Sequence, residues 1–363
     1  MKVLHCAETI KGGVASYLRE LISLQAQDFG AGSVALVLPA SQLGELPVPE
    51  GVRVYPYADH RGRAANAFEL ARVVLAKVRE FRPEIVHIHC TYAGATVRPA
   101  LWLLARKLRV VYCPHGWAFS RPLAWPGYTM VRLVEKLLAN VTESIVCISE
   151  HERQLALRAG IRADRLKLVL NGVAATRPPG DGEPPPWMPG RTRLLFAGRF
   201  DDAKGVDILF DALRLLGDKV HAIVAGDTVL ADGAALAVPD NASLTGWLTQ
   251  AELERLFDSA DVLVVPSRYE GFSLIAAEAM RAGLAVIASR VGGLPEVVGD
   301  GICGVIIEPG SAAALAHCIE SHDRSDWQRM GRNGPDRVRT LFTMERVHRE
   351  TGDLYRQGSR RRE

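Results

Sequence analysis

Short runs of apolar residues recur along the whole chain, and amphipathic stretches separate most of them. In the first half, the runs expected to form strands are KVLHCA, SVALVLP, VRVYPY, EIVHIHC, RVVYCP, SIVCIS and LKLVLNG. Segments such as FELARVVLAKVREF and HERQLALRAG are typical of helices between them. Because these strands are continuously apolar, the pattern predicts a parallel sheet with helices on both faces.

The same pattern resumes after a segment rich in proline and glycine. This segment, AATRPPGDGEPPPWMPGR at residues 174–191, disfavours helix and sheet, so we interpret it as a linker. The strands expected after it are RLLFAGR, HAIVAGD, ASLTGW, DVLVVPS, LAVIASR and GVIIEP. A helical stretch at about 325–357 and a basic tail, RQGSRRRE, end the chain.

The fold class predicted from this order is α/β, with two Rossmann-like, doubly wound domains. We place an N-terminal domain at residues 1–175 and a C-terminal domain at 176–340. Residues 341–363 are expected to form a C-terminal helix and basic tail that pack back toward the N-terminal domain. Open parallel sheets bind ligands beyond the carboxyl ends of their strands, so we expect two such domains to face each other across a ligand-binding cleft.

Composition narrows the possible functions. The net charge is only +3, which gives no argument for nucleic-acid binding. The six cysteines form no CxxC pair, so we expect buried thiols in a reducing compartment and no zinc site. No apolar run approaches the roughly 20 residues of a membrane-spanning helix. We therefore expect a cytoplasmic protein, at most attached to the cytoplasmic face of a membrane.

Two strand-to-helix turns in the second half carry candidate chemistry. In GRFDDAKG, Arg199 follows a strand and Lys204 opens a helix, which suits a polyanion such as a diphosphate. The alternative is that both cations pair with Asp201 and Asp202. In RYEGFSLIAAEAM, residues 268–280, a helix begins near Ser273, and its first N–H groups could hold phosphate oxygens.

Two glutamates in the second of these motifs need an explanation. Glu278 lies inside an apolar helix, where it could accept hydrogen bonds from two vicinal hydroxyls, as on a ribose. Glu270 lies in the loop and could reach a sugar. The alternatives are a helix-dipole carboxylate for Glu270 and a structural salt bridge for Glu278.

Together, GRFDDAKG, PSRYEGFSLIAAEAM and AVIASRVGGLPEVVGDGICGVIIEP resemble the donor domain of retaining GT-B glycosyltransferases of family 4, also called group 1. The two glutamates match the E-x7-E motif of that family. The likeness covers nearly the whole second half, and the first half matches more loosely. It implies a GT-B fold with an acceptor-binding N-terminal domain and a donor-binding C-terminal domain.

The resemblance also implies a role for each matched residue. Arg199 and Lys204 would hold the donor diphosphate. Glu278 would bind the ribose, and Glu270 would contact the transferred sugar near its reacting carbon. Main-chain contacts are expected at Gly271, Phe272, Ser273 and Leu274 for phosphate and at Thr245, Gly246 and Trp247 for the nucleobase. Many family members have glycine where Ser273 stands, and we expect serine to be tolerated there with some crowding.

The first half supplies further candidates. Gly12 and Gly13 lie between a strand and a helix, where paired glycines allow a ligand to approach the backbone. A plain tight turn is the alternative, and the G-x-G-x-x-G fingerprint of dinucleotide sites is missing. His115 follows the strand VVYCP, and a core or capping histidine is the alternative there. The resemblance implies that the glycine loop faces the donor phosphate and the acceptor, and that His115 faces the donor sugar.

We therefore expect an enzyme that moves a hexose from a UDP- or GDP-sugar to a hydroxyl of a glycan or lipid-linked acceptor, in bacterial-type polysaccharide or glycolipid biosynthesis. His115, Glu270, Arg199 and Lys204 are the expected catalytic residues. We expect no cofactor and no metal, since no Asp-x-Asp pair occurs. Competing hypotheses are a GT-B sugar-nucleotide epimerase and a non-catalytic nucleotide-sugar-binding subunit; the missing fingerprint disfavours a nicotinamide dehydrogenase.

Two segments of the first half mix basic and apolar residues. They are RPALWLLARKLR at residues 98–109 and RPLAWPGYTMVRLVEKLL at residues 121–138. Basic amphipathic stretches with aromatic residues can lie on anionic membranes, which raises the hypothesis of a lipid-linked acceptor at the inner membrane face. The alternative is a pair of ordinary helices that pack on their own sheet with solvated basic faces.

Overall fold

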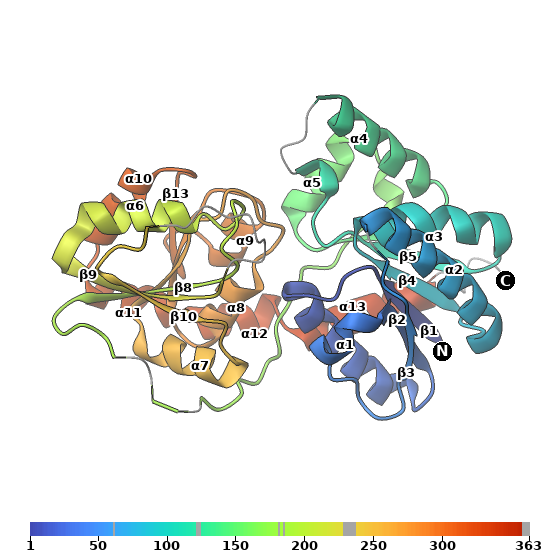
Figure 1. Ribbon diagram of the computed structural model, residues 1–363, viewed down its shortest axis with the longest axis horizontal. Helices are drawn as coiled ribbons and strands as arrows, with labels where there is room; N and C mark the ends of the chain where they lie inside the picture. Colours follow the sequence, from blue (N-terminus) through green and yellow to red (C-terminus); the bar gives the residue numbers. More distant parts are fainter. Residues whose placement is uncertain (61, 121–124, 181, 184–185, 228–236, 358–363) are drawn as a thin grey trace. The chain divides into compact units, whose positions relative to one another are not determined.

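The described chain forms two compact units, each with its own parallel sheet. The computed structural model describes residues 1–363 apart from 61, 121–124, 181, 184–185, 228–236 and 358–363. The first unit comprises Met1–Asn171 and the segment that begins at Met344, and the second comprises Gly172–Thr343 (Figure 1). The chain therefore enters the second unit once and returns to the first for its last helix.

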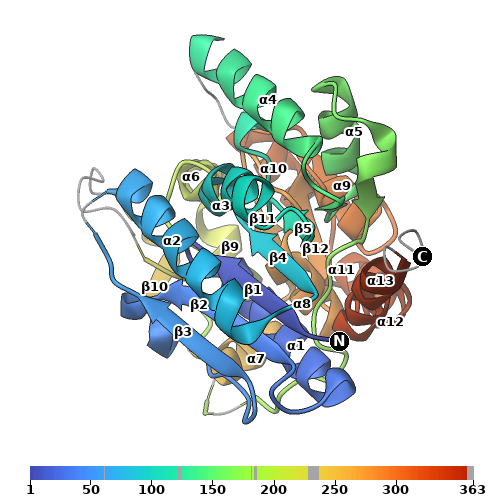
Figure 2. The same ribbon diagram turned by 90° about the vertical axis from the view of Figure 1, so that its right-hand side faces the viewer.

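The first unit contains a seven-stranded parallel sheet with strand order β3-β2-β1-β4-β5-β6-β7. The strands β3, β2, β1 and β4 can be followed across it in Figure 2. Its strands are β1 Val3–Ala7, β2 Val34–Pro39, β3 Arg53–Tyr57, β4 Ile85–His89, β5 Arg109–Cys113, β6 Ser144–Cys147 and β7 Leu166–Leu168. Its helices are α1 Gly13–Phe29, α2 Arg63–Phe81, α3 Thr91–Leu104, α4 Trp125–Ala139, α5 Glu150–Arg158 and α13 Met344–Gln357, with short 3-10 turns at Ala40–Glu45, Ala118–Ser120 and Ala163–Arg165.

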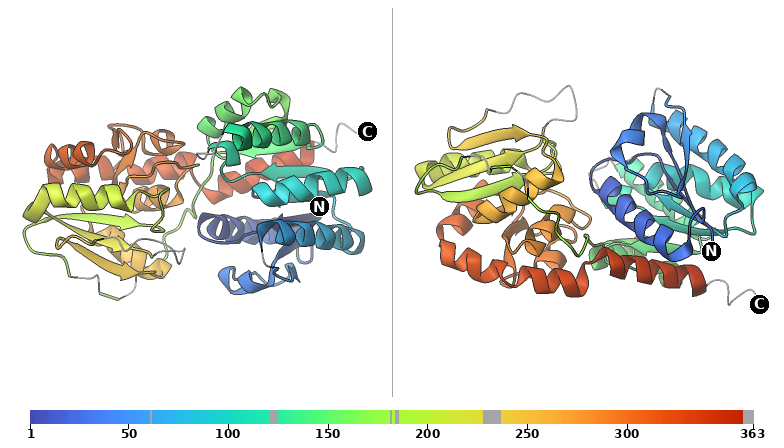
Figure 3. Two further views of the ribbon diagram at one scale, coloured as in Figure 1. Left: turned by 45° about the horizontal axis from the view of Figure 1, so that its top comes forward. Right: turned by 90° about the horizontal axis from the view of Figure 1, so that it is seen from below.

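Helices cover both faces of this sheet. α2 and α3 pack together over one face, where alternate strand residues such as Leu4, Cys6, Val86 and Ile88 enter the apolar core. α13 lies beside α1, as Figure 3 shows for the red and blue helices. Arg109 anchors α13 by donating to the carbonyl oxygens of Leu354, at 3.2 Å, and Tyr355. The last helix is thus part of the first unit's structure.

The second unit contains a six-stranded parallel sheet with strand order β10-β9-β8-β11-β12-β13. Its strands are β8 Thr192–Ala197, β9 Val220–Ala225, β10 Ala242–Gly246, β11 Val262–Val265, β12 Ala285–Ser289 and β13 Gly304–Ile307. Its helices are α6 Val206–Leu216, α7 Gln250–Ser259, α8 Leu274–Arg281, α9 Leu294–Val298, α10 Ala312–Glu320, α11 Arg324–Gly331 and α12 Gly334–Leu341, with a 3-10 turn at Gly217–Lys219. α6 and α10 pack together over one face (Figure 1).

The predicted fold class is confirmed, and each expected strand is present. The helical stretch expected at about 325–357 is instead divided into α11, α12 and α13. Pro335 stands at the start of α12, where it has no N–H with which to continue a helix from α11. The glycines beside the break allow close packing, because a Cβ on Gly331 would lie 2.1 Å from the Gly283 carbonyl oxygen and one on Gly334 would lie 2.3 Å from that of Met280. The second break follows Phe342, which is fully buried.

The proline-rich segment interpreted as a linker contains no helix or strand in its described residues, but it is held on the second unit. Arg281 donates to the carbonyl oxygen of Ala174 at 2.7 Å, and Arg177 pairs with the buried carboxylate of Glu254 at 2.7 Å. Trp187 donates its indole N–H to the hydroxyl of Ser259 at 3.1 Å. Side chains of α7 and α8 therefore bind the backbone and the side chains of this segment.

Two further expectations concern cysteines and membranes. All six cysteines lie in the described part of the chain, where they are buried and form no disulfide. Among the described residues, no helix combines the length and the apolar character that crossing a bilayer requires.

Candidate active site

The candidate donor site of the second unit is built at the carboxyl ends of β8 and β11. Arg199 and Lys204 lie in the turn between β8 and α6, and Glu270 lies in the turn between β11 and α8. A Cβ on Gly205, which has a φ of +67°, would lie 2.2 Å from the carbonyl oxygen of Pro266. The two turns therefore pack backbone against backbone, which requires glycine at this position.

Lys204 and Glu270 contact each other across these turns. The lysine ammonium forms an ion pair with Oε2 of Glu270, and both side chains are largely buried, at 24% and 14% exposure. Oε1 of Glu270 accepts a hydrogen bond from the Gly271 N–H at 3.3 Å. Gly292, at a φ of +56°, lies so close that a Cβ there would be 1.6 Å from the Glu270 carbonyl oxygen. The position of Glu270 is thus fixed from both its side chain and its main chain.

Arg199 agrees with the alternative interpretation of GRFDDAKG, in which the cations of the motif pair with its own aspartates, but Lys204 does not. The Arg199 guanidinium, which is about half exposed, pairs with Asp201 at 2.9 Å. Lys204 instead uses only its backbone N–H toward Asp201, at 3.2 Å. Asp202 faces Arg268 at 3.3 Å. The structure therefore brings Lys204 to Glu270, while Arg199 lies against an acid of its own turn.

The first turn of α8 has no side-chain cap. Its N-cap residue, Ser273, makes no capping hydrogen bond, whereas Thr249, Ser311 and Asp323 cap α7, α10 and α11 with theirs. Ser273 adopts a φ of +79° and is 5% exposed, and among the described residues its hydroxyl has no hydrogen-bond partner. Left-handed backbone favours glycine, so serine is held in an unfavourable conformation at this position.

The other predicted donor-binding residues lie in or next to α8 and at the end of β10, which β9 and β8 separate from β11. Phe272 is buried against Phe342, with 5.3 Å between ring centroids, and Leu274 begins α8. Glu278 is half-buried in the same helix. Thr245 and Gly246 end β10, where the Gly246 carbonyl accepts a hydrogen bond from Gly226 at 2.8 Å. Trp247 follows with 61% of its surface exposed.

His115, Gly12 and Gly13 belong to the first unit. Gly12 is the N-cap of α1, with a φ of +57° and no side-chain capping bond. A Cβ there would have no atom within 4 Å, so glycine is needed for the backbone conformation and not to avoid a clash. Both glycines are exposed. An exposed backbone at the start of a helix is the arrangement that the sequence predicted.

His115 lies directly after β5 and is held in a strained conformation. Its φ is +51°, and Gly116 follows at +111°. Its Nε2 lies 2.9 Å from Nδ1 of His89, and its ring meets that of Tyr17 edge-on at 4.8 Å. Burial lowers the pKa of His115 to about 4, so the ring is neutral at pH 7.

Sequence reasoning missed several buried polar residues behind His115. His5, His87 and His89 are fully buried on β1 and β4, and Gln25 and Tyr355 contact them from α1 and α13. Within the described residues, these three histidines are the one group that could hold a metal ion, with ligand atoms within 4.8 Å of one another. The signal was available in IVHIHC, because residues two apart on a strand face the same side.

Two glutamates were also missed. Glu8 caps α3, since its carboxylate accepts from the N–H groups of Tyr92 at 3.1 Å and Ala93 at 2.9 Å. Glu152 lies on α5 behind the loop of His115 and Gly116, and burial raises its pKa to about 7. Its Oε2 accepts from the Ile148 N–H at 3.3 Å. These acids shape the loops at the strand ends of the first unit.

Two family models match the chain. The model described as "Glycosyl transferase 4-like domain" matches residues 12–172, and the model described as "Glycosyl transferases group 1" matches residues 191–322. The first thus covers most of the first unit, and the second covers most of the second unit.

Relatives and solved structures agree with these matches. The chain is 29% identical to an uncharacterized 41.2 kDa protein in the cps region of Klebsiella pneumoniae, over 90% of this chain and 91% of that protein. It is 27% identical to GDP-mannose:cellobiosyl-diphosphopolyprenol alpha-mannosyltransferase of Komagataeibacter xylinus, over 88% and 83%. Its fold matches that of Anabaena HepE in complex with UDP, with a TM-score of 0.78, 18% identity, and coverage of 98% of this chain and 100% of HepE.

Proposed function

Because the chain belongs to the group 1, family 4-like glycosyltransferases, we propose that it transfers a hexose from a nucleotide diphosphate sugar to an acceptor hydroxyl with retained configuration. The observation that carries this proposal is the ion pair between Lys204 and Glu270 beside the uncapped first turn of α8. A cation, a carboxylate and unsatisfied helix amides suit a ligand that has a diphosphate next to a sugar.

The diphosphate is proposed to bind Lys204, Arg199 and the first turn of α8. A diphosphate carries more charge than one carboxylate, so it competes with Glu270 for Lys204 and with Asp201 for Arg199. When the bond to the sugar breaks, negative charge grows on the departing phosphate oxygens. The two cations and the helix amides would stabilise that charge, the role that a metal ion has in other transferases. We therefore propose a metal-independent reaction.

Glu270 is proposed to position the sugar and not to attack it. Both of its carboxylate oxygens already have partners, Lys204 and the Gly271 N–H. A carboxylate held in this way is a fixed acceptor for sugar hydroxyls. We infer that the acceptor hydroxyl attacks from the face that the diphosphate leaves and gives its proton to that diphosphate. Isolation of a glycosyl adduct on Glu270 would contradict this role.

The donor is proposed to be a UDP- or GDP-sugar. HepE is a structural match in complex with UDP and, in another structure, with UDP-glucose, and the relative in Komagataeibacter xylinus is named for GDP-mannose. In this chain the base would lie near Thr245, Gly246 and Trp247. Because these positions offer main-chain groups and one exposed indole ring, side-chain identity alone does not select between uracil and guanine.

A panel of UDP-, GDP- and ADP-sugars tests this proposal. A donor at 100 times its Kd stabilises the protein by about 2.7 kcal/mol, so the melting temperature should rise for one base class. Transfer should then require an acceptor and persist in EDTA. Conversion of the sugar without an acceptor would indicate an epimerase, and binding without transfer or hydrolysis would indicate a non-catalytic subunit. An absolute need for manganese would contradict the metal-independent mechanism.

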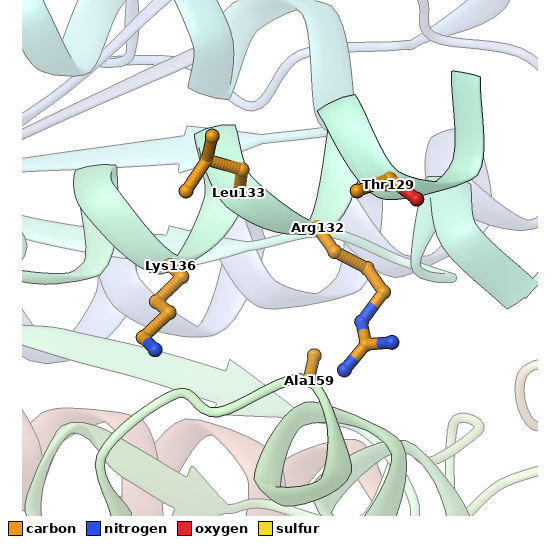
Figure 4. Close-up of a pocket in the computed structure, with 5 residues that line it drawn as sticks. All are labelled: Thr129, Arg132, Leu133, Lys136 and Ala159. Carbon is orange, nitrogen blue, oxygen red and sulfur yellow. The ribbon is translucent and has the colours of Figure 1, made fainter. Parts of the chain in front are cut away.

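We also propose that the first unit docks on an anionic membrane that carries the acceptor. On α4, Met130, Leu133, Val134 and Leu137 are exposed at helical spacing, and Trp125 is 80% exposed. Arg132 and Lys136 point from the same helix toward Ala159 and line a hollow between α4 and α5 (Figure 4). An apolar stripe with cations beside it is suited to lipid tails and anionic headgroups.

The segment at residues 98–109 contributes less charge to this surface than its sequence suggested. Arg98 is fully buried and pairs with Glu135 at 2.7 Å, and Arg109 pairs with Glu143 at 2.8 Å. Trp102, Leu103 and Leu104 are nevertheless exposed at the end of α3. Residues 121–124 of the second segment lie outside the described residues.

A further inference from the structure

A line of hydrogen-bonded side chains runs from His115 into the interior of the first unit. β1 and β4 are neighbours, and their register places His5 opposite His87. His89 lies two residues further along β4, on the same face as His87. All three rings are fully buried, on the face opposite the α2 and α3 core.

The contacts in this line are short and continuous. Nε2 of His115 lies 2.9 Å from Nδ1 of His89, whose Nε2 lies 3.0 Å from Nδ1 of His5. Nε2 of His5 lies 2.7 Å from Oε1 of Gln25 on α1. We call these four residues, Gln25, His5, His89 and His115, the histidine chain. A branch leaves it at Gln25, whose amide donates to the Tyr355 hydroxyl at 3.4 Å, and that hydroxyl lies 2.6 Å from Nδ1 of His87.

Each ring of the histidine chain is neutral at pH 7. Burial lowers the pKa of His5 and His115 to about 4 and that of His89 well below its ordinary value. A neutral imidazole has one N–H and one lone pair. Consecutive rings can therefore bond only if every ring donates in the same direction along the chain.

Gln25 sets that direction. Its carbonyl oxygen can only accept, so His5 carries its proton on Nε2 and offers Nδ1 as an acceptor. His89 then donates from Nε2 to His5 and accepts at Nδ1 from His115. The proton of His115 consequently lies on Nε2, and Nδ1 keeps its lone pair.

We propose that the histidine chain fixes the tautomer of His115, so that Nδ1 accepts a hydrogen bond from a hydroxyl of the donor sugar. This inference rests on the proposed function. Gln25, His5 and His89 act through His115 and are positioning residues. The strained backbone at His115 supports the proposal, because such strain persists where surrounding contacts hold a residue in place.

A metal ion held by His5, His87 and His89 is the competing explanation of the cluster. His5 and His89 already use both ring nitrogens in the chain, and a metal would have to break those bonds. The trio includes no carboxylate, so a buried divalent charge would have no counter-charge from its ligands. Nε2 of His87 has no hydrogen-bond partner among the described residues, but one nitrogen atom is not enough to hold a metal ion.

Nuclear magnetic resonance of the full chain with 15N-labelled histidine tests the tautomer directly. Long-range proton–nitrogen correlations should show His5, His89 and His115 as neutral rings protonated on Nε2 at pH 7.5. The exposed His60 and His317 serve as references for the mixed tautomers of solvated rings. A proton on Nδ1 of His115, a mixture there, or a doubly protonated ring would overturn the proposal. So would one equivalent of zinc bound to the trio.

A matched pair of variants separates positioning from a structural role. His89→Leu interrupts the histidine chain, and His87→Leu removes an equally buried ring of the same strand that lies outside it. We expect His89→Leu to change the His115 tautomer and lower kcat/KM about tenfold, the scale of one lost hydrogen bond. His87→Leu should change neither. Equal losses in both variants, or none in His89→Leu, would overturn the proposal.

Two parts of the proposal can be tested separately: the tautomer that the histidine chain fixes, and the hydrogen bond from the donor sugar to His115. The tautomer is read on the protein without donor, so it tests the chain whether or not the enzyme uses nucleotide sugars. Addition of the donor found in the thermal panel should then shift the Nδ1 resonance of His115. A fixed tautomer with no such shift would overturn the assignment of Nδ1 to the sugar.

Discussion

At the scale of single residues, acidic partners hold the cations of the candidate donor site: Glu270 holds Lys204, and Asp201 holds Arg199. Glu270 and Lys204 hold each other, and Gly292 fixes the main chain of Glu270. In the proposed reaction the cations exchange these partners for the diphosphate, while the main chain of Glu270 stays in place. The ring of His115 is likewise held in place, by buried neighbours.

Ser273 is strained in the folded protein, and its replacement by glycine should relieve that strain. A non-glycine residue at positive φ costs about 1–3 kcal/mol, and glycine loses part of that gain to its freer unfolded chain. We expect Ser273→Gly to raise the free energy of unfolding by about 1 kcal/mol, measured by urea denaturation. The control is Ser311→Gly, which removes a capping bond at ordinary φ and should lower stability. Destabilisation by Ser273→Gly would contradict this interpretation.

Glu152 should make stability fall as pH rises. The pKa of Glu152 is about 7 in the folded protein, whereas that of an ordinary glutamate is 4.5. Between these pH values the folded protein therefore binds more protons than the unfolded protein. The contribution of Glu152 to wild-type stability therefore falls from pH 4.5 to 7, by up to about 3 kcal/mol at 1.36 kcal/mol per pKa unit. Glu152→Gln removes this titration. Its advantage over the wild type in urea denaturation should grow between pH 5 and pH 8, and a constant difference would contradict the raised pKa.

At the scale of elements, α3 and α4 bury a pair of opposite charges and leave apolar side chains exposed to solvent. The ion pair of Arg98 and Glu135 joins α3 to α4, and the Arg98 guanidinium lies over the Tyr112 ring at 3.9 Å. The side of α4 that remains exposed is apolar along Met130, Leu133 and Leu137. On its buried side, α4 packs on the core through Val131 and Ala139 as well as through Glu135. A helix that is also apolar along its exposed side is suited to a partner there.

Vesicle flotation tests the membrane as that partner. The wild type should bind vesicles with anionic lipid at low salt, and binding should weaken as salt screens the cations. The double variant Leu133→Gln, Leu137→Gln should lose most of this binding. Leu215→Gln, at an exposed leucine of α6, is the matched control and should bind as the wild type does. Vesicle binding by the double variant equal to that of the wild type would contradict the proposal. So would a wild-type dimer that the double variant fails to form, because the apolar face would then bind a second copy of the chain.

At the scale of the whole molecule, the apolar pattern predicted the strands because inner strands of both sheets, such as β2 and β11, are buried and apolar along their length. Local pattern did not show how the elements meet. Lys204 and Glu270 are 66 positions apart, and His87 and Tyr355 are 268 apart. Contacts of this kind depend on strand register and on the return of α13 to the first unit. The resemblance to a family supplied the donor-site residues, whereas the histidine chain required coordinates.

The central claim is that Lys204 and the first turn of α8 stabilise the departing diphosphate, and Lys204→Ala tests it most directly. The control is Lys219→Ala, at an exposed lysine of the same unit that pairs with Glu320. With the donor and acceptor that the wild type uses, single-turnover transfer by Lys204→Ala should be about 10²–10³ times slower while the protein remains folded. Lys219→Ala should transfer at the wild-type rate. A Lys204→Ala rate within a few-fold of the wild type would contradict the account.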